Sequence, residues 1–167
     1  IRLSFGPAMT ADECTTACNA IVRLAGIVQR CCLVLSDAEP LADMAASGLT
    51  QLKHEDMCSY LLVCSKSQQA VIIDPVVALA NRLANMVQGQ GLQLVAVLDT
   101  HLHQDHRSAR DDLTALLGLD NQQASDVLGW PFGVESIECG QYKLSKLATP
   151  GHSAESRSYL LSKQGEI

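Results

Sequence analysis

The sequence predicts an α/β fold, because strand-like and helical segments alternate through most of its length. Two short apolar segments, 59–64 and 70–74, are joined by a polar stretch, as is typical of a β-hairpin. Helical periodicity over 77–88 ends at Gly89, and a further apolar strand follows at 92–99. Strand, helix and strand in this order indicate a crossover unit, whose functional residues lie at the carboxyl ends of the strands.

Two further segments predict helices. Thr10 with Glu13 three residues later is a capping box, which predicts the start of a helix. Cys14 and Cys18 recur at helical spacing on its apolar face, where we expect small buried residues and not metal ligands. Residues 108–117 predict the second helix.

Composition narrows the class of protein. A chain of 167 residues with 47% hydrophobic residues is long enough for one domain with a core and too short for two full domains. The net charge of −6 and the lack of a basic run exclude broad binding to nucleic acid or to an anionic membrane. No apolar stretch approaches the roughly 20 residues of a membrane span. Seven cysteines at irregular spacing favour a reducing, cytoplasmic location over a disulfide framework.

A cluster of histidines directly follows the strand at 92–99. His101 and His103 are two residues apart, so in extended backbone their side chains leave the same face. Asp105 and His106 follow closely enough to face a second point nearby. Imidazole nitrogens and carboxylate oxygens suit zinc, iron or manganese. We therefore predict a metal site here, the alternative being a solvated polar loop.

A second polar loop, Thr149–Ser156, lies between strand-like segments at 142–147 and 158–161. Its Pro-Gly pair forces a tight turn, which presents His152 from the end of a strand. A lone histidine is more often an ordinary polar residue, but the first cluster needs a further nitrogen ligand. We therefore predict that His152 joins the metal site. His54 has no such support and is expected at the surface.

The motifs Thr-His-x-His-x-Asp-His and Thr-Pro-Gly-His resemble those of the metallo-β-lactamase superfamily. The Ile72–Val76 segment is most similar to its glyoxalase II and persulfide dioxygenase branch. The resemblance covers residues 51–167 and implies an αββα sandwich, of which this chain has the N-terminal portion, preceded by a helical segment.

The resemblance also assigns roles to the motif residues. It implies that His101, His103 and His152 bind a first metal, and that Asp105 and His106 bind a second metal in two-metal members. We take Asp105 as the catalytic residue. In persulfide dioxygenases, one Fe(2+) is held by the counterparts of His101 and His152 and by a later aspartate.

Other positions support the site or depart from the family pattern. Asp74 matches an aspartate that supports the metal site from below. Arg107–Ala109 stands where a Gly or Ser-Gly pair is usual, and Ser153–Glu155 replaces Thr-x-Gly. Both departures bear on substrate preference and leave metal binding in place.

The beginning of the chain resembles a different family. Arg2–Gly6, followed by the capping box, is similar to the extreme C-terminus of PLP-dependent cysteine desulfurases, in which the counterpart of Arg2 binds the carboxylate of cysteine. We therefore expect a desulfurase tail at 1–31, a linker at 32–50 and a metallo-β-lactamase-like domain at 51–167 that is truncated at its C-terminus. The chain is expected to be a fragment of a fusion.

These resemblances favour a persulfide dioxygenase-like enzyme that uses Fe(2+) to oxidise a small-molecule thiol persulfide to sulfite. One alternative is a hydrolase that uses two Zn(2+) ions to cleave a thioester, as glyoxalase II does. The other is a non-catalytic module that binds metal or a partner. The fragment alone is expected to be inactive, and its half-sandwich to expose an apolar sheet face.

Overall fold

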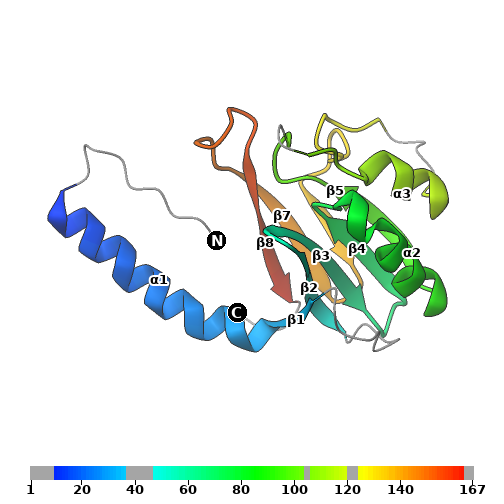
Figure 1. Cartoon of the computed structure of the whole chain (residues 1–167), viewed down its shortest axis with the longest axis horizontal. Coiled ribbons are helices and arrows are strands. Elements are labelled where there is room, and N and C mark those ends of the chain that lie inside the picture. Colours follow the sequence, from blue (N-terminus) through cyan, green and yellow to red (C-terminus); the bar gives the residue numbers. More distant parts are fainter. Residues whose placement is uncertain (1–9, 37–46, 104–105, 120–123, 164–167) are drawn as a thin grey trace. The chain divides into compact units, whose positions relative to one another are not determined.

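The structure is a computed structural model that describes residues 10–36, 47–103, 106–119 and 124–163, the side chains of 24–36 excepted. The chain divides into two compact units, residues 1–32 and 33–167. Figure 1 shows their helices and strands. In chain order these are α1 (Ala11–Cys31), β1 (Cys32–Ser36), β2 (Gly48–His54), β3 (Met57–Cys64), β4 (Gln69–Ile73), the 3-10 helix η1 (Val77–Leu79), α2 (Ala80–Gly89), β5 (Gln93–Leu98), α3 (Arg110–Leu116), β6 (Ser136–Cys139), β7 (Tyr142–Ala148) and β8 (Arg157–Lys163).

Helix α1 begins at the predicted capping box. The backbone N–H of Thr10 donates to the Glu13 carboxylate (2.8 Å), and the N–H of Glu13 donates to the Thr10 hydroxyl (3.3 Å). These bonds hold the pKa of Glu13 below its usual value. Cys14 is half-buried and Cys18 is exposed, so the expected burial is wrong for Cys18. The described residues of the unit 1–32 are essentially helix α1 alone. They contain no second element against which the side of Cys18 could pack. Arg2 lies outside the described residues.

Five strands form the larger sheet, in the order β1-β2-β3-β4-β5. β3 pairs antiparallel with β4, which confirms the predicted hairpin. β4 and β5 are parallel and are connected through η1 and α2, which confirms the predicted crossover. The carboxyl ends of β4 and β5 therefore lie at one edge of the sheet, where Asp74 and Asp99 begin the loops that follow.

Three strands lie where the sequence predicts none. β1 and the first residues of β2 fall within 32–50, the segment expected to be a linker, of which 37–46 lies outside the described residues. β2 pairs antiparallel with β3 along its whole length. His54, expected at the surface, is half-buried at the end of β2. The short strand β6 forms a separate three-stranded sheet with β7 and β8.

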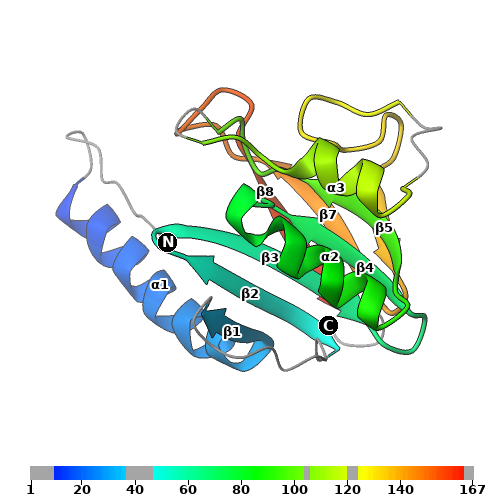
Figure 2. The same ribbon diagram turned by 45° about the vertical axis from the view of Figure 1, so that its right-hand side comes forward.

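Each face of the larger sheet is covered. Helices α2 and α3 lie on one face and the smaller sheet lies on the other (Figure 2). Side chains alternate between the faces, so Leu61 packs on the helix side and its neighbour Leu62 packs between the sheets. This burial on both faces explains why β3 and β4 read as continuous apolar runs. Leu83 of α2 and Leu113 of α3 pack in the core on the helix side of the sheet, and Trp130 packs in the core between the two sheets.

The unit 33–167 thus contains a layer of helices and two layers of sheet. These correspond to three of the four layers of the predicted αββα sandwich. No described helix is long and apolar enough to cross a membrane.

Candidate metal centre

Asp74, His101 and His103 form a compact cluster at the carboxyl ends of β4 and β5. Each offers one ligand atom, and these three atoms lie within 4.8 Å of one another. The Nε2 atom of His103 lies 3.4 Å from an Asp74 oxygen. The ring centroids of His101 and His103 are 4.1 Å apart. The resemblance made Asp74 a support for the site, and the structure places it directly among the candidate ligands.

Thr100 connects Asp74 to His101. Both the backbone N–H and the hydroxyl of Thr100 donate to the Asp74 carboxylate, over 2.6 and 2.8 Å. The Thr100 hydroxyl oxygen lies 3.0 Å from His101 Nδ1. Because its one proton goes to Asp74, this oxygen accepts a hydrogen bond from Nδ1–H, so that the ring lone pair of His101 lies on Nε2, the nitrogen that suits a metal. Thr100 therefore orients a candidate ligand, a role that its local sequence context does not indicate.

The Asp99 carboxylate joins the two ends of the loop that carries His101 and His103. The Ser108 hydroxyl donates to one oxygen of this buried carboxylate (2.7 Å), and Arg110 donates to the other (3.2 Å). Burial raises the pKa of Asp99, while the Ser108 hydrogen bond and the Arg110 charge act in the opposite direction. The loop that carries His101 and His103 is thus tied together at both ends.

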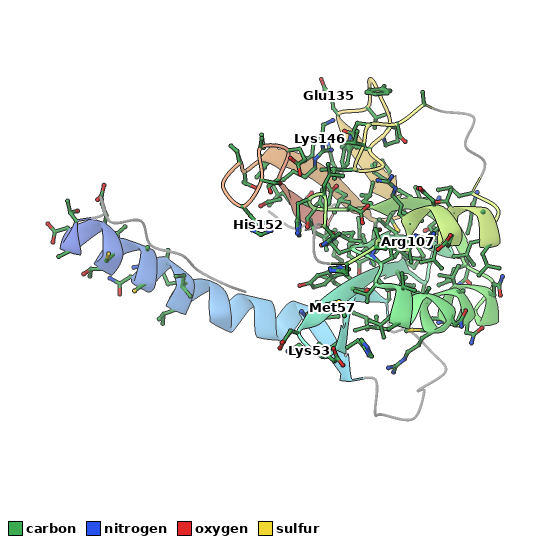
Figure 3. All side chains as sticks on the ribbon, turned by 45° about the horizontal axis from the view of Figure 1, so that its top comes forward. Lys53, Met57, Arg107, Glu135, Lys146 and His152 are labelled. Atoms are coloured by element: carbon green, nitrogen blue, oxygen red, sulfur yellow. The ribbon has the colours of Figure 1, made fainter. Side chains whose placement is uncertain are left out.

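The structure brings two more predicted histidines to this cluster. Figure 3 shows His152 on the loop between β7 and β8, and its ring is perpendicular to that of His101 with centroids 4.9 Å apart. The ring of His106 lies 4.3 Å from that of His103. Four predicted histidines are therefore neighbours in space. Asp105, the predicted catalytic residue and ligand, lies outside the described residues.

Two hydrogen bonds join the loop of His152 to the loop of His101. The backbone N–H of Arg157 donates to the Thr100 carbonyl (2.9 Å), and the backbone N–H of Leu102 donates to the Glu155 carboxylate (3.2 Å). The side chain of Ser153 also bonds to Glu155 and holds the pKa of Glu155 below its usual value. Only the spatial arrangement identifies Glu155, which the sequence marked just as a departure from a family pattern.

A cavity of about 230 Å³ opens onto the cluster. Its volume is slightly below the roughly 300–1,000 Å³ of typical small-molecule pockets, so it suits a small ligand. The side chains from β3 and the turn before it combine a carboxylate, a thioether, a thiol and a phenol. The cavity is lined by Asp56, Met57, Cys58, Tyr60, Asp74, His101, His103 and His106.

The donor set fits a metal ion. Imidazole nitrogens and a carboxylate oxygen are ligands common to zinc and non-haem iron, and their spacing here allows one ion to contact several of them. The bond from Thr100 to His101 is of the kind that orients ligating histidines in metalloproteins. The residues present therefore can hold zinc or iron.

Sequence comparison finds relatives of two named activities. No family model matches the sequence. The chain is 31% identical over 160 residues to mitochondrial persulfide dioxygenase ETHE1 of Mus musculus, covering 87% of this chain and 57% of that protein. It is 35% identical over 113 residues to the hydroxyacylglutathione hydrolase-like protein of Homo sapiens, covering 64% and 38%. The chain thus spans less than two thirds of either relative.

Solved structures share the fold. ETHE1 from Myxococcus xanthus matches with a TM-score of 0.57 and 34% identity, covering 68% of this chain and 53% of that one. A metallo-β-lactamase from Staphylococcus aureus matches with a TM-score of 0.57 and 30% identity, covering 72% and 40%. These matches confirm the predicted fold class.

Proposed function

Because its relatives and structural neighbours show a metallo-β-lactamase superfamily domain in this chain, we propose that the domain is an Fe(2+)-dependent enzyme that oxidises a small-molecule thiol persulfide to sulfite. The observation that carries this proposal is the convergence of His101, His103 and His152 beside Asp74. Relatives named persulfide dioxygenase support the choice of reaction: the mouse protein aligns with 87% of the chain and the bovine protein with 68%, while the human protein, with 62%, aligns with about as much of the chain as the hydrolase-like relative.

The proposed roles follow from the contacts. His101, His103 and His152 would hold the iron, and Asp105 and His106 would be ligands of a second ion in the two-metal alternative. Asp74 and Thr100 orient His101 so that its Nε2 atom faces the ion. Ferrous iron bound by histidine and carboxylate supplies open positions for the persulfide sulfur and for dioxygen.

A second candidate is a hydrolase that cleaves a glutathione thioester with two Zn(2+) ions. It is favoured by the ring of His106 beside that of His103, which offers ligands for a second ion. It is also favoured by the hydroxyacylglutathione hydrolase-like relative. Two zinc ions would lower the pKa of a shared water to about 7.

Metal analysis combined with two assays tests the proposal. The purified protein is loaded anaerobically with Fe(2+), and oxygen consumption is measured with glutathione persulfide; a zinc-loaded sample is tested with a glutathione thioester. For the complete protein we expect one iron per chain and persulfide-dependent oxygen consumption, reduced more than about 100-fold in His101→Ala and His152→Ala but not in His54→Ala; residues 1–167 alone are expected to show little of either.

Each other outcome selects an alternative. Two zinc ions with thioester cleavage would replace the dioxygenase by the hydrolase. Stoichiometric metal binding with neither activity would favour a non-catalytic metal-binding module.

Two further expectations stay with this proposal. A cytoplasmic location remains a prediction; the mouse relative is named as mitochondrial. The resemblance of residues 1–31 to a desulfurase tail also stays a prediction, since the helix start at Thr10 supports the local structure and not the enzyme.

A further inference from the structure

Few hydrogen bonds join the loop that carries His152 to the rest of the domain among the described residues. His152 is exposed, and several hydrogen bonds of this loop stay within it. The side chains of Ser153 and Ser156 bond to each other (2.7 Å), and the N–H of Gly151 donates to the carbonyl of Ser153 (3.2 Å). Such bonds shape the turn but do not position it against the other histidines.

Glu155 makes a side-chain hydrogen bond that crosses to the first loop, in addition to the contact between the His152 and His101 rings. Its Oε1 atom accepts from the N–H of Leu102, the residue between His101 and His103. This N–H belongs to the peptide group that joins His101 to Leu102, so its orientation affects the direction in which the His101 side chain leaves the backbone. One carboxylate therefore touches the loop of His152 and the backbone between the two other proposed ligands.

The identity of this residue matters to the contact. The glycine usual at this position in the resembled branch has no side chain that could reach Leu102. Hydrogen bonding to the Ser153 side chain also lowers the pKa of Glu155 and so favours the carboxylate form that accepts from Leu102. The other bond between the loops, from the N–H of Arg157 to the Thr100 carbonyl, joins the base of the turn and not its tip.

We propose that Glu155 is a positioning residue that sets His152 against His101 and His103 by joining the two loops. This inference rests on the proposed metal site and adds a residue to it. Glu155 accepts a hydrogen bond and its charge also faces His101, and we expect the acceptor oxygen to contribute more than the charge to positioning. A residue that holds a ligand in this way typically changes metal affinity by about 10- to 100-fold.

Substitutions separate the oxygen from the charge. Glu155→Ala removes the acceptor, whereas Glu155→Gln keeps a carbonyl oxygen at the same reach without the charge. Cobalt affinity of the complete protein is measured by titration with Co²⁺ alone, with its visible absorption as the signal. We expect a loss of at least about 10-fold in Glu155→Ala and less than about 3-fold in Glu155→Gln. Glu135→Gln, an exposed carboxylate away from both loops (Figure 3), is the matched control and should bind as the wild type does.

Amide hydrogen exchange of Leu102 in metal-free protein provides an independent readout. We expect protection in the wild type and in Glu155→Gln, and its loss in Glu155→Ala, with unchanged thermal unfolding. Equal cobalt loss in both Glu155 variants would assign the effect to charge and overturn the proposal, as would an unprotected Leu102 amide in the wild type. Normal cobalt binding without persulfide oxidation would instead contradict the proposed function and leave this inference standing.

Discussion

The loop after β5 and the loop between β7 and β8 both carry histidines of the candidate metal centre, but they are held differently. The first is bonded to buried carboxylates at its base, Asp74 and Asp99. The second is exposed at His152 and is shaped largely by bonds among its own serines. The core therefore fixes the first loop, and the second takes its position from the first. Substitutions that loosen the first loop should mainly lower stability. Substitutions in the second loop should lower metal affinity more than stability.

The largest contrast is expected between two glycines. Gly129 follows Leu128, whose carbonyl accepts from the N–H of Asp99 at the base of the first loop. Its φ is +84°, and a Cβ there would overlap the Val97 carbonyl oxygen. Gly151 lies in the second loop, where an added Cβ would meet no neighbouring atom within 4 Å. Gly129→Ala should therefore lower the free energy of unfolding by more than about 3 kcal/mol, and Gly151→Ala by less than about 0.5 kcal/mol. Urea denaturation measures both, and equal losses would contradict the contrast.

Asp74→Ala should have the next largest effect, because it removes both acceptors for Thr100. Hydrogen bonds to a charged group contribute roughly 1.5–3 kcal/mol, so we expect about 3 kcal/mol of destabilisation with a loss of metal affinity. Asp74→Asn keeps one acceptor and tolerates the φ of +50° at this position, so it should lose about half as much. Urea denaturation and cobalt titration test both. An alanine variant as stable as the wild type would show that the first loop has another anchor.

Tyr159→Phe should produce a smaller loss. The Tyr159 hydroxyl donates to the Asp99 carbonyl (2.7 Å), and burial raises the pKa of this phenol so that it stays protonated. Phenylalanine retains the stacking on Trp130 and loses the hydrogen bond, which contributes about 1 kcal/mol. The control is Tyr142→Phe, because the Tyr142 hydroxyl makes no hydrogen bond among the described residues. Thermal unfolding compares the two, and equal shifts would argue against the Asp99 contact.

Ser153→Ala should have the smallest effect on stability. It removes the bond to Ser156 and the support of Glu155 in a solvent-facing turn, so we expect less than about 0.5 kcal/mol. Cobalt affinity should nevertheless fall a few-fold, because Glu155 loses its orientation. A change in stability larger than the change in affinity would reverse the proposed difference between the loops.

Local patterns predicted the elements that carry the site. The hairpin, the crossover helix and the strand before His101 have apolar periodicity that does not depend on distant residues, and the structure confirms them. β2 has only Leu49 and Leu52 in a mixed polar segment, so its strand state depends on pairing with β3. A sequence shows no trace of such pairing.

The site followed the same division. Spacing identified His101 and His103, the Pro-Gly loop between two strands identified His152, and the structure brings the three histidines together. Thr100 and Glu155 have ordinary local contexts, and their importance lies in contacts with Asp74 and Leu102. Those contacts depend on how β4, β5 and β8 meet, which short-range patterns do not encode.

The hydrogen bond from the Leu102 N–H to Glu155 also bears on the order in which the two histidine loops form during folding. The contact between Thr100 and Asp74 closes 26 residues, whereas those of Glu155 and Tyr159 close 53 and 60. Each doubling of a closed loop costs roughly 0.6 kcal/mol of chain entropy, and translation releases the N-terminal residues first. The first histidine loop can therefore form before His152 has been synthesised, so the four histidines of the proposed metal site come together only in a later step.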